Sequence, residues 1–106
     1  MILTEVLQDK RFVVLTTGLS VHLRKEFPQL SEDMRSTIAM ISALLIQEDP
    51  QVDMNVYLSN LTQSVLTYNQ IYREALPSNL FLYIVANVQS MYTISYSDYG
   101  DDENEE

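Results

Sequence analysis

Three prolines divide this chain of 106 residues into segments that each suit one helix and a short connection. Proline breaks the interior of a regular helix, so helices should begin or end near Pro28, Pro50 and Pro77. The resulting segments are roughly 20 to 27 residues long, and a chain of this length supports one hydrophobic core. We therefore predict a mainly α fold, a small four-helix bundle-like domain over residues 1–97.

Apolar spacing supports a helix in each segment. In the first segment, the apolar stripe contains Phe12, Leu15, Leu19, Leu23 and Phe27. The second helix should begin at Ser31, a favourable N-cap residue, and end near Glu48. Asp49-Pro50 predicts the start of a third helix that runs toward Pro77, and the fourth should start at Ser78. The residues of the third segment that recur with helical periodicity up to Pro77 are Val52, Val56, Leu61, Val65, Tyr68, Ile71, Tyr72 and Ala75.

Two segments also have strand character. Residues 12–17 are rich in β-branched side chains, and residues 92–97 alternate Tyr or Ile with Thr or Ser. The alternative fold is therefore α+β, in which 12–17 and 92–97 pair as two short strands. In either fold, a helix break is expected near Asp9–Arg11.

The acidity of the chain is concentrated at its C-terminal end. The net charge is −9, and residues 98–106 supply six acids and no base. Residues 1–97 hold nine acids and six bases, which leaves −3. Like charges repel one another and bury no apolar surface, so residues 98–106 are predicted to be a flexible, disordered tail. The tail acids are Asp98, Asp101, Asp102, Glu103, Glu105 and Glu106.

The rest of the C-terminal two thirds is almost uncharged. Residues 36–97 contain only five charged side chains, whereas an average domain would place about fifteen there. Asn, Gln, Ser, Thr and Tyr take their place, a composition typical of protein interfaces, although a buried core would show the same depletion. On the third helix, the expected interface residues are Tyr57, Asn60, Gln63, Ser64, Thr67, Tyr68 and Tyr72.

Composition argues against most enzymatic chemistry. The chain has no Cys, one His and two Gly, so thiolate chemistry, histidine relays and phosphate-cradling loops have no residues to build them. His22 and Glu26 lie one helical turn apart, but two ligands do not make a metal site. The acids Glu48, Asp49 and Asp53 lack a calcium-loop pattern. We expect no enzyme activity, no catalytic residue, no cofactor and no metal.

Charge and hydropathy also limit the partners. An acidic body disfavours direct nucleic-acid binding, and the uncharged stretch 75–97 has too many polar residues for a membrane span. The N-terminal residues do not resemble a signal peptide, so an intracellular, cytoplasmic location is expected. Small size and the lack of cysteine and catalytic motifs are typical of phage or bacterial accessory proteins.

The sequence therefore predicts a protein–protein interaction module, a small self-associating or complex-assembly component. Its partner would be another protein or a second copy of itself. The alternative is an acidic inhibitor or regulator whose tail occupies a basic, nucleic-acid-binding surface of a partner protein.

Overall fold

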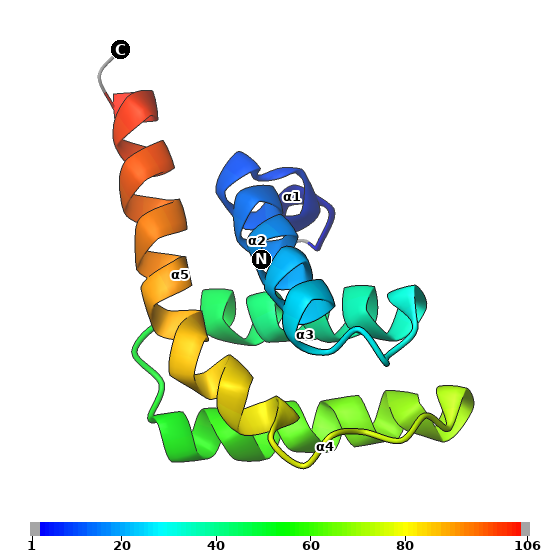
Figure 1. Cartoon of the computed structure of the whole chain (residues 1–106). Coiled ribbons are helices and arrows are strands. Elements are labelled where there is room, and N and C mark those ends of the chain that lie inside the picture. The colour runs from blue at the N-terminus through cyan, green and yellow to red at the C-terminus, as the bar shows by residue number, and fades with distance from the viewer. Residues whose placement is uncertain (1–2, 105–106) are drawn as a thin grey trace.

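The computed structural model describes the backbone of residues 3–104 and the side chains of residues 5–97. Its helices are α1 (Leu3–Gln8), α2 (Lys10–Glu26), α3 (Glu32–Glu48), α4 (Met54–Tyr72) and α5 (Leu80–Asn104), shown in Figure 1. The mainly α prediction is confirmed. Residues 3–104 contain no strand, and the α+β alternative is wrong because 12–17 lie inside α2 and 92–97 inside α5.

The first proline segment forms two helices rather than one, at the break that the sequence predicted. Asp9 interrupts the chain between α1 and α2 and caps α2, its carboxylate accepting from the Arg11 backbone amide at 2.8 Å. The Arg11 guanidinium binds the same carboxylate through Nε at 3.1 Å and Nη2 at 2.8 Å. These hydrogen bonds lower the pKa of Asp9. The charged cap stabilises the start of α2 directly after the break.

The boundaries of α3 match the sequence prediction, whereas those of α4 do not. Ser31 caps α3, and its Oγ accepts from the Met34 amide at 3.1 Å. The predicted helix start at Asp49-Pro50 is wrong, since Asp49 is the C-cap of α3 and the next helix begins only at Met54. Asp53 caps α4 by accepting from two backbone amides.

The other end of α4 also differs from the prediction. The helix stops at Tyr72, well before Pro77, because Arg73 adopts a left-handed conformation with φ 57°. The Asn69 side chain then holds the turn, donating to the Glu74 carbonyl and accepting from the Glu74 amide, both at 2.9 Å. A left-handed residue at this position is a common way to end a helix.

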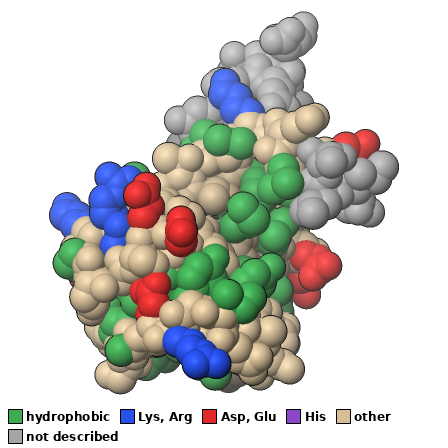
Figure 2. Space-filling view, turned by 90° about the vertical axis from the view of Figure 1, so that its right-hand side faces the viewer, with side chains coloured by type: hydrophobic (Ala, Val, Ile, Leu, Met, Phe, Trp, Pro, Cys, Tyr) green, Lys and Arg blue, Asp and Glu red, His purple; other side chains and the backbone are tan. Residues whose placement is uncertain are grey.

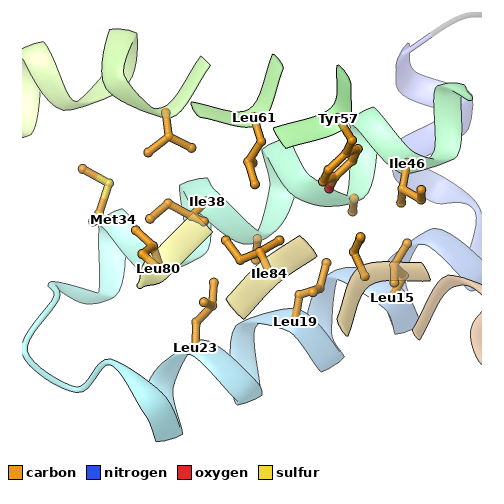
Figure 3. Close-up of a cluster of buried hydrophobic side chains, with 14 of the residues drawn as sticks. Leu15, Leu19, Leu23, Met34, Ile38, Ile46, Tyr57, Leu61, Leu80 and Ile84 are labelled. Atoms are coloured by element: carbon orange, nitrogen blue, oxygen red, sulfur yellow. The ribbon is translucent and has the colours of Figure 1, made fainter. Parts of the chain in front are cut away.

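The helices form two crossing layers. In Figure 1, α3 and α4 lie side by side and antiparallel. Helix α5 packs against both, α2 packs against α3 and α5, and α1 packs against α2. Between the layers lies a core to which α2, α3, α4 and α5 all contribute large apolar side chains (Figure 3). The central residues are Leu15, Leu19, Leu23, Met34, Ile38, Ile46, Tyr57, Leu61, Leu80 and Ile84.

One polar connection crosses this core. The hydroxyl of Tyr57 on α4 donates to the backbone carbonyl of Ser42 on α3 at 2.7 Å, and both residues are buried. The Ser42 hydroxyl donates in turn to the Ile38 carbonyl at 2.7 Å. Burial raises the pKa of Tyr57 well above its usual range. The bond fixes the register of α4 against α3 in an otherwise apolar layer.

Candidate protein-interaction surface

The outer side of α3 is left open by the arrangement of its neighbours. Helix α3 packs against α2 on one side and α4 on the other, and in the described part of the chain α2 and α4 do not contact each other. The side of α3 that faces away from the core carries no charged residue from 36 to 47. We call this surface the α3 face, and it is formed by Ser36, Thr37, Met40, Ile41 and Leu44.

Two shallow hollows flank Met40, which is 43% exposed. The hollow toward α2 has a volume of about 250 Å³, and Val21 and Arg24 are among its lining residues. The hollow toward α4 has a volume of about 200 Å³ and lies between α3 and Tyr68. The walls of both hollows are mostly uncharged: the hollow toward α2 is lined largely by Thr and Ser, and the hollow toward α4 is more apolar.

Exposed apolar side chains are also conspicuous in the space-filling view. Figure 2 shows hydrophobic side chains gathered in a band through the middle of the face that is turned to the viewer, with Lys and Arg at the left, the bottom and the top of the view. Scattered single hydrophobic residues are ordinary on protein surfaces, whereas a continuous group marks a site of interaction.

Helix α4 places most of the predicted interface residues at the surface. Asn60, Gln63 and Thr67 are exposed, and Ser64 is half-buried. Tyr68 and Tyr72 are partly exposed and border the α3 face, where the Tyr72 hydroxyl lies 3.4 Å from Thr37 Oγ1. These six residues lie on the surface of one helix.

Tyr57 is the exception among the predicted interface residues. It is 1% exposed and belongs to the core, so it offers no surface to a partner. The physical reason is its helical register, because Tyr57, Leu61 and Val65 repeat every four residues on the buried side of α4.

The sequence analysis missed several exposed apolar residues of this region. Val56 and Ile71 were part of the helical periodicity of the third segment but not among the predicted interface residues, and they are 49% and 77% exposed. Leu66 on α4 and Met40 on α3 are similarly accessible. The signal that could have found Val56 is the register of Tyr57, Leu61 and Val65, which places Val56 on the opposite side of the helix and Ile71 at the flank of the buried stripe.

Within residues 5–97, the charged side chains that border the α3 face lie at its two ends. Arg24 lines the hollow near Ser36, and Arg73 follows Tyr72 at the same end. Asp33 also lies in the first turn of α3 at this end. At the other end, the last residue of α3 is the exposed Glu48, followed by Asp49. The middle of the surface is therefore uncharged, one end carries the two arginines together with Asp33, and the other end carries Glu48 and Asp49.

The remaining residues considered for chemistry do not assemble into a site. Among the described residues, no group of three or more His, Cys, Asp or Glu could hold a metal ion. The His22 ring nitrogen Nδ1 lies 3.0 Å from the Gly18 carbonyl oxygen, one turn earlier in α2. A hollow of about 370 Å³ between α2 and α5 is lined partly by His22 and Met91. In the described backbone, α5 continues through residues 98–104 of the predicted acidic tail, whereas the side chains of 98–106 lie outside those that the structure describes.

Comparisons with known proteins give no independent indication of function. Models of protein families, curated proteins and solved structures were all compared with the chain, and none matches it. In the described residues, no helix has the length and apolarity needed to cross a membrane.

Proposed function

We propose that this protein acts by binding protein through the surface formed by α3 and α4, as a small self-associating or complex-assembly component. One observation carries the proposal: residues 36–47 and 54–72 include no charged side chain, yet they expose Met40, Tyr68 and Ile71. Helices that face water usually carry Glu and Lys on their exposed side. Interface centres are instead depleted in charge and enriched in Tyr and Met.

The exposed apolar side chains supply a driving force for binding. Complete burial of a large apolar side chain contributes about 1.5–3 kcal/mol. Ile71 is 77% exposed, while Met40 and Tyr68 are close to half exposed, so a partner that covers all three gains several kcal/mol at most. This gain must offset the entropy lost on association. The surface therefore suits a partner that covers much of both helices at once.

Tyr68→Lys tests the proposal because Tyr68 lies on α4, borders the α3 face and is 48% exposed. Its matched control is Ile94→Lys, since Ile94 is an apolar residue on α5 that is 57% exposed. Molar mass is measured by light scattering at low and high salt, and tagged proteins are used to capture partners. We expect Tyr68→Lys to weaken self-association or partner capture, whereas Ile94→Lys leaves both unchanged.

The proposal is overturned if Tyr68→Lys self-associates as strongly as the wild type and captures the same proteins in the same amounts. Deletion of residues 98–106 addresses the acidic-inhibitor alternative in the same assays. If that deletion abolishes partner binding and Tyr68→Lys does not, the acidic segment is the binding element, and binding should weaken steeply with salt.

A further inference from the structure

We infer that Glu74 is a latch that closes the connection between α4 and α5 over the start of α3, and that this connection opens when the carboxylate is removed or protonated. The connection consists of residues 73–79, and we call it the strap. Local opening at this end of the fold is a property beyond the proposed function.

The latch completes a helix cap that the sequence of α3 leaves open. Ser31 is the N-cap, and its Oγ accepts from the amide of Met34, the third residue of the helix. A Glu or Gln at that third position usually returns a hydrogen bond to the N-cap amide. Met34 cannot do so, because its side chain is apolar and fully buried in the core. Glu74 supplies the missing acceptor from the strap, 43 residues beyond Ser31 in the chain.

Both oxygens of the Glu74 carboxylate bind the N-cap residue. Oε1 accepts from the Ser31 backbone amide at 2.9 Å, and Oε2 accepts from the Ser31 hydroxyl. The first amides of a helix have no intrahelical acceptor, and a negative charge is favourable at this end of the helix dipole. Hydrogen bonds with Ser31 accordingly lower the pKa of Glu74 below 4.5, so the latch is closed at neutral pH.

Few contacts hold the strap to the rest of the fold. On the α4 side of the latch, the Asn69 side chain binds both backbone groups of Glu74 at 2.9 Å. Beyond Glu74, no hydrogen bond within the described part of the chain joins residues 75–79 to α2, α3 or α4. Leu76 packs against the core but is only partly buried. Without the latch, the strap would therefore depend mainly on the packing of Leu76.

Charged groups near the latch come from α3 and from the strap itself. Arg35 of α3 attracts the Glu74 carboxylate, and Arg73 precedes it in the chain. Glu32 and Asp33, in the first turn of α3, have the opposite effect because they carry like charge. Helix α4 and the residues between α2 and α3 carry no charged side chain. Two bases and two acids largely balance, which leaves the hydrogen bonds to the N-cap as the main stabilisation of the carboxylate.

Amide hydrogen exchange in the whole chain tests the latch. The decisive amide is that of Leu80, which donates to the Pro77 carbonyl of the strap at 3.2 Å and has no hydrogen bond with Glu74. In Glu74→Ala, we expect the protection factor of this amide, measured by NMR at neutral pH, to fall about tenfold. The matched control is the amide of Val52, which donates to the Asp49 carbonyl at 3.1 Å in the connection between α3 and α4. Its protection should change by no more than about twofold.

Acid provides the second test, because protonation removes the charge without a substitution. As pH falls below 4.5 through the folded pKa of Glu74, the protection of the Leu80 amide should fall in the wild type. Glu74→Gln has no titrating group at this position, so its Leu80 amide should not show this fall. The Gln side chain still offers an acceptor to the Ser31 amide, so this variant should fold even if Glu74→Ala does not.

The inference is supported if the Leu80 amide of the wild type is less protected than that of the buried Leu61 and loses protection both in Glu74→Ala and in acid. It is overturned if Leu80 is as protected as Leu61, because the strap then opens only when the whole chain unfolds. Unchanged protection of Leu80 in Glu74→Ala also overturns it. So does an equal fall at Val52, since the effect of Glu74 is then not local.

Discussion

The hydrogen bond from Tyr57 to Ser42 predicts a specific loss of stability in Tyr57→Phe. The substitution keeps the buried ring and removes only the hydroxyl that donates to the Ser42 carbonyl at 2.7 Å. A buried hydrogen bond contributes about 0.5–1.5 kcal/mol net. The Ser42 carbonyl lies inside α3 and keeps its helical hydrogen bond, so we expect the free energy of unfolding to fall by about 1 kcal/mol and no more.

The same residue predicts a dependence on alkaline pH. Burial raises the pKa of Tyr57 in the folded protein above its ordinary value of 10. The folded state therefore retains a proton that the unfolded state releases, so this contribution to stability is complete below pH 10 and is lost as pH rises. Above pH 10, the ionisation of Tyr57 in the unfolded state should lower the free energy of unfolding by about 1.4 kcal/mol per pH unit. The free energy of unfolding of Tyr57→Phe should therefore fall less steeply with pH.

Urea denaturation followed by circular dichroism at several pH values measures both effects, since the chain has no Trp to report by fluorescence. Tyr68→Phe is the matched control, because Tyr68 is exposed and the change should stay within about 0.5 kcal/mol. The reasoning is refuted if Tyr57→Phe is as stable as the wild type at neutral pH and declines equally steeply above pH 10.

Three further predictions concern the helices and their caps. Gly18→Ala should stabilise the protein by about 0.5–1 kcal/mol in urea denaturation, because the new Cβ meets only the terminal methyl of the flexible Met91 side chain, at 2.8 Å. A loss of stability would show that this tip cannot move. Asp53→Ala should cost about 1 kcal/mol in the same assay and Asp49→Ala clearly less, since only Asp53 caps α4; equal losses would contradict this assignment. Hydrogen bonds from Ser31 lower the pKa of Glu74 below its ordinary 4.5, so its contribution to stability is present above pH 4.5 and is lost as pH falls through the folded pKa. Glu74→Gln should therefore flatten the acid side of the stability profile, and an unchanged profile would contradict the linkage.

The sequence predicted most of the fold from periodicity and capping. The stripe of α2 and the N-cap Ser31 lie where the pattern indicated. The start of α4 was misjudged because Asp49-Pro50 and Asp53 both resemble helix starts. The antiparallel packing of α3 and α4 requires a reversal of the chain between them, and residues 49–53 provide it. That requirement is tertiary and leaves no local signal.

The strand alternative failed for a reason that is visible in α5. Residues at i and i+4 share one face in a helix and also in a strand, so Tyr92 and Tyr96 fit both periods. In the structure their rings stack with centroids 4.2 Å apart along the helix. Ile94 distinguishes the helix from the strand. A strand would place Ile94 on the same face as Tyr92 and Tyr96, whereas α5 leaves it 57% exposed.

The candidate site was predicted in part, because low charge has two different physical origins in this chain. On α3, Ile38, Ala39 and Ser42 are buried, and burial alone explains why they are uncharged. On the exposed sides of the helices, packing imposes no such condition, yet Met40 and Thr67 also lack charged neighbours on their own helices. Sequence composition counts buried and exposed uncharged residues together, whereas the structure shows which of them are buried and which are exposed. The part that burial does not explain is the surface of α3 and α4, and this is the surface on which the proposed protein binding rests.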